Sequence, residues 1–181
     1  MNTRTRLAAL TAAMALSTLA TTATATADDN PPPWAQLCGG LVPTIFAQPG
    51  VATTGTNLPD VIEGTPFPDV IYGAQGNDVI CGLDGDDVIY GGPGDDLIYA
   101  QDGDDNVDSG IGNDTVIGGY GNDNVRAGDG EDTVLGGPGN DDMRGETGPD
   151  TLDGGPHTTQ DRADGGPQPD SCPNSEVVVD C

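Results

Sequence analysis

The sequence predicts an all-β fold, a solenoid in which very short strands and tight turns stack coil upon coil. Three observations predict it. Asp recurs every nine residues, without a gap, from residue 55 to residue 153. An aliphatic residue or Met stands two places after each of these aspartates. Only 4% of the residues are aromatic while 29 are Gly, a composition that favours a repeat architecture over an ordinary core of large side chains.

Residues 1–27 are typical of a secretory signal peptide. Arg4 and Arg6 form its basic start, residues 7–20 are apolar, and Ala27 ends an A-x-A cleavage site. An N-terminal anchor helix is the alternative, but the apolar stretch is short for a membrane span and rich in Thr and Ala. We therefore expect a secreted, extracellular protein, cleaved near Ala27, with no membrane span.

The four cysteines fit an exported chain, because disulfides are the default in an oxidising compartment. They are Cys38, Cys81, Cys172 and Cys181. Four cysteines allow three connectivities, and their order in the sequence does not choose among them. Free thiols or a cysteine metal site are the alternative, which the wide spacing and the lack of a C-x-x-C motif disfavour.

Eleven consecutive nonapeptides fill residues 55–153. The Gly-rich half of each repeat supplies a tight turn, and the Asp-x-aliphatic half a very short strand. Because such a strand is unstable alone, it must pair with equivalent strands in neighbouring repeats. The eighth, aliphatic place then fills a narrow interior, while places seven and nine point outward.

Two of the repeats, GGPGDDLIY (91–99) and GGYGNDNVR (118–126), match every fixed place of the pattern G-G-x-G-x-D-x-U-x. In this the chain resembles the RTX, or hemolysin-type, calcium-binding proteins, in particular their small secreted actinobacterial type. The resemblance implies a right-handed parallel β-roll with two nonapeptides per coil. It also implies several calcium ions between stacked turns, held by backbone carbonyls and the sixth-place Asp.

Carried over to this sequence, the resemblance assigns the metal ligands to two edges of the roll. One edge would hold Asp78, Asp96, Asp114, Asp132 and Asp150, and the other Asp87, Asp105, Asp123 and Asp141. Asp60 and Asp69 are weaker candidates, because Leu58-Pro59 and Phe67-Pro68 stand where Gly and a polar residue belong. After residue 153 the stretch GGPHTTQDR departs from the period.

The charge balance supports calcium as the partner. The formal net charge is −25, and all 30 acidic residues follow residue 27, which argues against nucleic acid. Carboxylates and carbonyls are hard donors that suit Ca²⁺ better than Mg²⁺, and zinc would need more than one His. A disordered acidic tail is the alternative, which the aliphatic column and the in-register Gly disfavour. We expect folding to be coupled to calcium binding.

The outer face of the first repeats is apolar, with Val61, Val70, Val79, Val88 and Leu97 at place seven and Tyr72, Tyr90 and Tyr99 at place nine. The segment 28–54, with Trp34, Leu37, Leu41, Val42, Ile45 and Phe46 around Cys38, is expected to cover it. Since Cys81 also points outward there, we expect a Cys38–Cys81 bridge. Residues 154–181 would form a degenerate repeat, with Cys172 at an eighth-type place after Asp170, and a C-terminal cap closed by Cys172–Cys181. Both bridges resemble those of the small secreted relatives, and intermolecular pairing is the alternative.

Three functions were weighed. The favoured one is a calcium-binding repeat protein with a structural or secretion-coupled role, acting as a monomer. The alternative is an adhesin-like or polysaccharide-binding module that uses the outward Tyr/Val face and binds extracellular polysaccharide or a cell-surface component. An enzyme is disfavoured, because the period accounts for the aspartates as ligands and His157 has no Ser or Cys nucleophile beside it.

Overall fold

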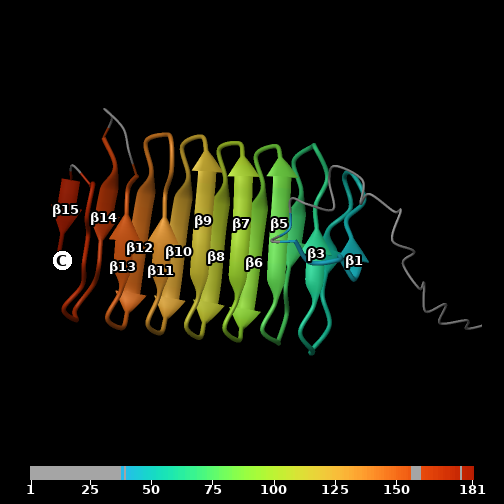
Figure 1. Ribbon diagram of the computed structural model, residues 1–181, viewed down its shortest axis with the longest axis horizontal. Coiled ribbons are helices and arrows are strands. Elements are labelled where there is room, and N and C mark those ends of the chain that lie inside the picture. Colours follow the sequence, from blue (N-terminus) through green and yellow to red (C-terminus); the bar gives the residue numbers. More distant parts are fainter. Residues whose placement is uncertain (1–37, 39, 156–159, 176) are drawn as a thin grey trace, which may run out of the picture. The chain divides into compact units, whose positions relative to one another are not determined.

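Two parallel β-sheets stack face to face and account for all the regular structure of the part described (Figure 1). The computed structural model describes residues 38, 40–155, 160–175 and 177–181. Sheet 1 contains β1 (Ile45–Phe46), β3 (Val61–Glu63), β5 (Val79–Asp84), β7 (Leu97–Asp102), β9 (Thr115–Tyr120), β11 (Thr133–Leu135) and β13 (Thr151–Asp153). Sheet 2 contains β2 (Thr53–Thr54), β4 (Val70–Tyr72), β6 (Val88–Pro93), β8 (Asn106–Ile111), β10 (Asn124–Asp129), β12 (Asp142–Thr147), β14 (Arg162–Asp164) and β15 (Val177–Val179).

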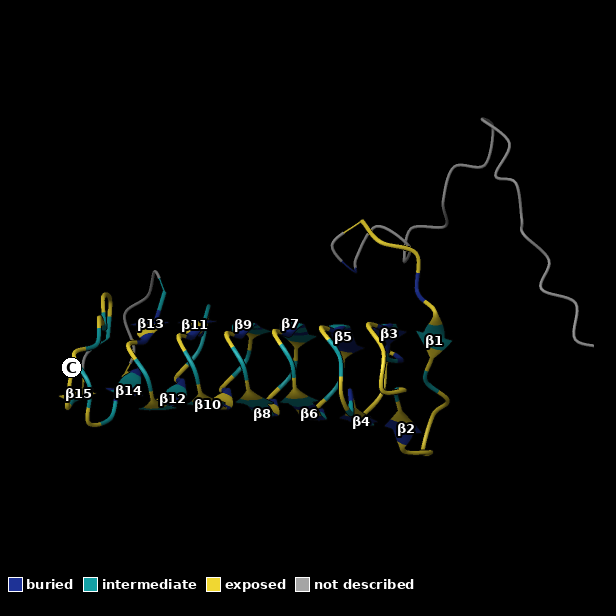
Figure 2. Ribbon diagram, turned by 90° about the horizontal axis from the view of Figure 1, so that it is seen from below, coloured by how far each residue is buried: buried dark blue, intermediate teal, exposed yellow. Residues whose placement is uncertain are grey.

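Successive strands from β3 to β12 alternate between the two sheets, so two nonapeptides make one coil. Figure 2 shows the strands of the two sheets as two facing rows. Each strand pairs in parallel with the strand one coil away, as in the register Val79↔Leu97↔Thr115, in which partners are 18 residues apart. The predicted parallel β-roll is therefore confirmed, and every equivalent place of alternate repeats lies in one row along the roll.

The core is the single row of eighth-place side chains from each sheet. These residues are all fully buried: Ile62, Ile71, Ile80, Ile89, Ile98, Val107, Val116, Val125, Val134, Met143 and Leu152. Places seven and nine lie on the outside and are half-buried or exposed in most repeats. Because the interior is only one side chain deep from each sheet, the core is long and narrow, as the repeat pattern predicts.

The fourth-place Gly allows the turns to stack closely. Gly94 has a φ of +144°, which an L-residue rarely adopts, and a Cβ there would overlap the carbonyl oxygen of Gly76 in the neighbouring coil. The same close approach recurs at Gly112 against Gly94. The turns therefore need Gly both for backbone conformation and for space.

The coil pattern continues beyond residue 153, where the sequence analysis expected the period to end. Asp161 and Asp170 take the sixth-place position, but each lies 20 residues after its predecessor rather than 18. Two inserted residues hide the repeat in the sequence without ending the stack. Cys172 then packs against the core, and β15 pairs with β14 as the last strand of sheet 2.

Both predicted disulfides are present. Cys38–Cys81 ties the N-terminal segment to the outer face of sheet 1, with Cα atoms 5.6 Å apart, and Cys172–Cys181 closes the C-terminal segment, with Cα atoms 6.1 Å apart. Cys38 and Cys81 are fully buried in a small cluster with Leu83, against which Val61, Val79 and Tyr99 pack.

The predicted cover over the first repeats is only partly correct. Ile45 and Phe46 form β1, which extends sheet 1 at its edge instead of covering its face. Leu41 and Val42 are exposed. Trp34 and Leu37, like the signal segment 1–27 and His157, lie outside the described residues. Within the described part, no helix has the length and apolar character to cross a membrane.

The three tyrosines do not share one face, because consecutive repeats belong to opposite sheets. Tyr99 packs near the Cys38–Cys81 bridge on sheet 1, whereas Tyr72 and Tyr90 lie on sheet 2. The latter two are 39% and 40% exposed and stack on each other, with ring centroids 5.0 Å apart and ring planes 6° apart. The expectation that all three lie under the N-terminal segment is wrong for this pair.

Candidate metal centre

Two columns of aspartates, all buried except the half-buried Asp170, line the two edges of the roll. Column 1 precedes the strands of sheet 1 and contains Asp60, Asp78, Asp96, Asp114, Asp132, Asp150 and Asp170. Column 2 precedes the strands of sheet 2 and contains Asp69, Asp87, Asp105, Asp123, Asp141 and Asp161. The structure thus brings the predicted candidates together in the two predicted sets and adds Asp161 and Asp170.

One oxygen of each carboxylate, from the second member of each column on, joins neighbouring coils. The backbone N–H of Asp60 donates to Oδ1 of Asp78 at 2.8 Å, and the same bond repeats along column 1 as far as Asp170. In column 2 it runs from Asp69 to Asp161, at 2.8 to 3.0 Å. These bonds hold each carboxylate in a fixed orientation without using its second oxygen.

The second oxygen, Oδ2, is buried and has no hydrogen-bond partner through most of both columns. This holds for Asp78, Asp87, Asp96, Asp105, Asp114, Asp123, Asp132, Asp150 and Asp170. A buried, ionised oxygen without a donor is costly, so it is normally paired or bound to a metal. The recurrence of the same unpartnered atom indicates a common ligand rather than a local defect.

Burial raises the pKa of the carboxyls from Asp78 to Asp132 in column 1 and from Asp87 to Asp123 in column 2, and also that of Asp150, and neighbouring carboxylates raise it further. The pKa of Asp87, Asp96 and Asp123 rises to about 7, and that of Asp105 and Asp132 to about 6. Adjacent strands lie about 4.8 Å apart. At that distance two unit charges repel by about 1 kcal/mol in water and by several times more when partly buried. Positive charge, as protons or as cations, therefore stabilises these carboxylates within the fold.

The first two repeats treat Oδ2 differently. The backbone N–H and the hydroxyl of Thr56 donate to Oδ2 of Asp60 at 2.7 and 2.8 Å. The N–H of Thr65 donates to Oδ2 of Asp69 at 2.6 Å, although Oδ1 of Asp69 has no hydrogen-bond partner. The oxygen that is available elsewhere is thus occupied by a neighbouring Thr. This supports the weaker rank that the sequence analysis assigned to Asp60 and Asp69.

A second polar ladder runs along the exposed turns at place five. The side-chain Oδ1 of Asn77 accepts from the N–H of Asp95, and that of Asp95 from the N–H of Asn113. On the other edge, Oδ1 of Asp104 accepts from the N–H of Asn122 at 2.7 Å. These bonds point to the following coil, opposite to those of the aspartate columns, so each pair of turns is tied in both directions.

The donor set fits a hard cation that accepts backbone oxygens. Among the described residues no three His, Cys, Asp or Glu side chains converge on one point. Each place would therefore contribute few carboxylates, and backbone carbonyls would have to supply the remaining ligands. The close stacking of the fourth-place Gly leaves carbonyls such as that of Gly76 beside a Cα with no side chain. Oxygen-only coordination by six to eight ligands is the chemistry of Ca²⁺.

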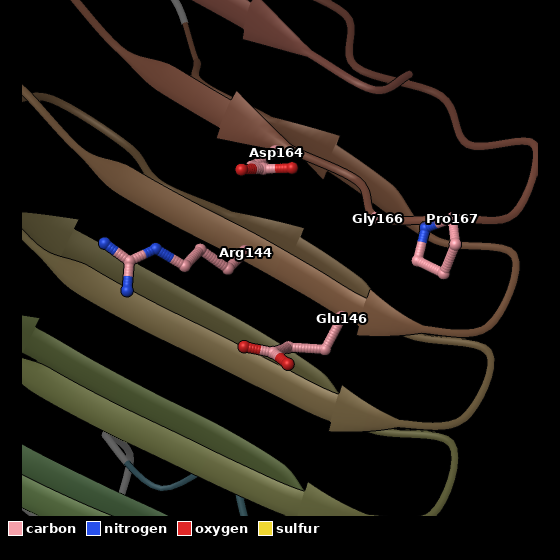
Figure 3. Close-up of a pocket in the computed structure, with 5 residues that line it drawn as sticks. All are labelled: Arg144, Glu146, Asp164, Gly166 and Pro167. Carbon is pink, nitrogen blue, oxygen red and sulfur yellow. The ribbon is translucent and has the colours of Figure 1, made fainter.

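The outer face of the last coils has a different character. Arg126, Arg144 and Arg162 lie on β10, β12 and β14 and pair with carboxylates, for example Arg162 with Asp142 at 2.7 Å. Figure 3 shows Arg144, Glu146 and Asp164 on one side of neighbouring strands, around a hollow of about 210 Å³. Charges of both signs meet here at the surface, so this face lacks the uncompensated carboxylates of the two columns.

Asp161 and Asp170 were missed as site residues in the sequence. The two-residue insertion shifts them out of register with the eleven repeats. The available signal was the Asp-x-apolar triplet, which recurs as Asp161-Arg162-Ala163 and Asp170-Ser171-Cys172. Ala163 is fully buried and Cys172 packs against the core, as the eighth place requires.

Comparison with known proteins gives one family. The model of the RTX calcium-binding nonapeptide repeat matches the chain in four overlapping copies, at residues 54–89, 82–116, 110–143 and 117–152. Together these copies cover more than half of the chain. No curated protein matches the sequence.

Proposed function

The chain belongs to the family of RTX calcium-binding nonapeptide repeat proteins, and on that premise we propose that it is a secreted protein that folds on binding calcium ions. The observation that supports this is the row of buried Oδ2 atoms without hydrogen-bond partners. We assign the ligand carboxylates to Asp78, Asp96, Asp114, Asp132 and Asp150 in column 1 and to Asp87, Asp105, Asp123 and Asp141 in column 2.

Calcium bound between the turns supplies the positive charge that the columns otherwise lack. The chain's own residues do the rest: the Oδ1 bonds orient each carboxylate, and the aliphatic ladder holds the turns in register. Because the unfolded chain spreads its carboxylates apart, repulsion favours unfolding when calcium is scarce. Binding to the folded state alone then couples folding to calcium concentration.

This coupling supports a secretion-coupled or structural role. A chain that stays unfolded where calcium is low and folds where it is high suits export, and the two disulfides fit an oxidising compartment. In this proposal residues 1–27 direct export, residues 28–54 and 154–181 pin the ends of the roll, and the protein is a monomer without catalytic activity.

Calorimetric titration of the chain from residue 28 with calcium tests the ligand assignment. In Asp96→Asn the Oδ1 bond to Asp78 can persist while the charge at Oδ2 is lost, so we expect about tenfold weaker binding at that site. Asp95→Asn, next to it at exposed place five, removes the same charge and is expected to change binding little. Equal effects of the two substitutions would refute the assignment to the sixth-place Asp.

A second candidate function is polysaccharide or cell-surface binding through the outward Tyr/Val face. The exposed Tyr72–Tyr90 pair on sheet 2, flanked by half-buried Val70 and Val88, favours it. Since the two rings stack on each other, they would offer mainly their edges and hydroxyls. Quenching of tyrosine fluorescence by added polysaccharide, lost in Tyr90→Ala, tests this function; no change in the fluorescence of the calcium-loaded protein would exclude it.

A further inference from the structure

A groove of about 340 Å³ lies at the N-terminal end of the roll, where its lining residue Thr65 adjoins Asp69, the first member of column 2. Its lining is mostly apolar: Phe46, Pro49, Glu63, Gly64, Thr65, Pro66 and Leu83. Phe46 comes from β1, Glu63 from the end of β3 and Leu83 from β5, so three neighbouring strands of sheet 1 meet there. The volume is that of a small ligand site.

Glu63 is the acidic residue in this lining, and one of its carboxylate oxygens is buried without a hydrogen-bond partner. The residue is 5% exposed, and its Oε2 makes no hydrogen bond. Burial raises the pKa of its carboxyl, since the apolar surroundings disfavour the charged form. The arginines of the described residues lie on β10, β12 and β14 of sheet 2, so none of them neutralises Glu63.

Leu83 adds apolar surface to the same groove. It is 8% exposed and has a φ of +84°, in the left-handed region that a Leu rarely occupies. Its place in the repeat is the second, which is Gly in the consensus. The same left-handed conformation occurs at Ala74, Gln101 and Glu146, which stand at the second place of other repeats, so the repeat geometry accounts for it and Leu83 contributes its apolar side chain to the lining.

The single carboxylate and the apolar lining of the groove exclude several classes of ligand. Ca²⁺ needs six to eight oxygen donors, and the lining offers one carboxylate among apolar side chains. An anion would be repelled by Glu63 and by the net charge of −25. A neutral apolar molecule would leave Oε2 without a partner. What remains is an apolar body that carries a positively charged N–H donor.

We propose that this groove binds an apolar amine, whose ammonium group donates to Glu63 while its hydrocarbon body packs on Phe46, Pro66 and Leu83. The charge-assisted hydrogen bond would satisfy the buried carboxylate, and the strongly acidic chain would attract a cation at long range. The groove adjoins Asp69 through Thr65, but neither Glu63 nor Asp69 is among the assigned calcium ligands, so the proposal does not depend on which aspartates bind calcium.

Calorimetric titration of the purified, calcium-loaded protein with benzylamine tests this, with benzyl alcohol as the matched neutral probe. We expect benzylamine to bind at least about tenfold more tightly than the alcohol. Glu63→Gln should reduce benzylamine binding to the level of the alcohol. Glu131→Gln removes one charge from an exposed turn on the same protein and should leave both affinities unchanged.

Three results would overturn the proposal: equal affinities for the two probes, equal losses in Glu63→Gln and Glu131→Gln, or no saturable benzylamine binding at millimolar concentrations. Should Glu63→Gln fail to fold, Phe46→Ala takes its place, since Phe46 is 54% exposed and its truncation spares the core. It should weaken the binding of both probes several-fold while keeping their ratio. Unchanged binding in Phe46→Ala would contradict the site.

Discussion

The first two repeats and the later ones place the sixth-place Asp at the edges of the roll, but its second oxygen is occupied in the first two repeats and unpartnered in most of the later ones. Thr56 and Thr65 stand at the second place of the first two repeats and donate to Oδ2. From Ala74 on, the second-place residue has positive φ in every repeat, and no such donor reaches Oδ2 of the aspartates with unpartnered oxygens. Thr is branched at Cβ and disfavours positive φ.

This difference indicates which residue decides whether the second aspartate oxygen is hydrogen-bonded within its own repeat or left available for a cation. A single residue type at the second place determines whether the carboxylate is satisfied within its own repeat. In the first two repeats the fourth place is Leu58 or Phe67 instead of Gly, and the backbone of these residues stacks closely on Gly76 and Gly85 of the next coil. Under the proposed function, ordinary hydrogen bonds satisfy the aspartates of the first two repeats, while those in the middle of the roll need cations.

The largest effect on stability is expected when the fourth-place residue is changed from Gly to Leu in the middle of the roll, compared with Leu to Gly in the first repeat. Gly94→Leu introduces a Cβ that overlaps the carbonyl of Gly76, at a φ of +144°. We expect it to destabilise the calcium-loaded fold by about 4 kcal/mol or more. Leu58→Gly, at the same place in the first repeat, should cost less than about 1 kcal/mol, because Leu58 is 69% exposed. Urea denaturation measures both; similar losses would refute the contrast.

A change of pH should affect the middle of the roll next most strongly. The pKa of Asp87, Asp96 and Asp123 is about 7 in the fold, against 3.8 ordinarily. Below 3.8 both folded and unfolded states hold the protons, and between 3.8 and 7 only the folded state holds them. Stability without calcium therefore falls as pH rises through this range, and the loss is complete above about 7.

Thermal melts in calcium-free buffers measure this dependence. We expect a higher melting temperature at pH 5 than at pH 8 without calcium. With calcium the order should reverse, because protons compete with the ion for Oδ2 and calcium affinity rises with pH. A calcium-free protein that is equally stable at both pH values would show that the buried carboxylates do not control folding.

Neutralising one aspartate in each region sharpens the comparison further. Asp114→Asn removes the charge of an unpartnered Oδ2, so we expect about tenfold weaker calcium binding together with a more stable calcium-free state. Asp60→Asn should leave calcium binding unchanged and cost about 1 kcal/mol, since it weakens the bonds from Thr56. Calcium titrations followed by circular dichroism distinguish these outcomes, and reversed effects would contradict the account.

The smallest effect is expected from the capping hydroxyl alone. Thr56→Val keeps the β-branched shape and the backbone N–H but removes the hydroxyl donor to Asp60. The loss should be about 1 kcal/mol in denaturant, with no change in calcium affinity. Thr54→Val, an exposed control in β2, should be neutral. Increased calcium binding in Thr56→Val would show that the hydroxyl, not the backbone, blocks Oδ2.

Much of the fold could be predicted because the same pattern, a Gly-rich turn followed by Asp and a buried aliphatic residue, occurs in eleven consecutive repeats. The period of nine, the aliphatic eighth place and the alternation of sides were enough for the core from Ile62 to Leu152 and for both columns. Cys38–Cys81 followed from the outward place of Cys81. The predictions of the core, the two columns and the Cys38–Cys81 bridge each depend on the place of a residue within its repeat, which can be read from the sequence.

The features of the fold and site that could not be predicted depend on how different repeats are placed relative to one another, which the sequence of a single repeat does not show. Tyr72 and Tyr99 occupy the same place, yet lie on opposite sheets because an odd number of repeats separates them. Asp161 was hidden by an insertion that only the stacking of coils tolerates. The Thr caps depend on the φ of one residue, and the groove at Glu63 on β1, a two-residue strand with no repeat pattern.

Far-UV circular dichroism of the calcium-stripped chain from residue 28, at neutral pH, tests the central claim most directly. Calcium is added stepwise, with magnesium in parallel. The account predicts a cooperative change from coil to β with calcium and little or none with magnesium. A full β signal already present in chelator at neutral pH would contradict it, since the aliphatic ladder and the disulfides would then suffice without a cation.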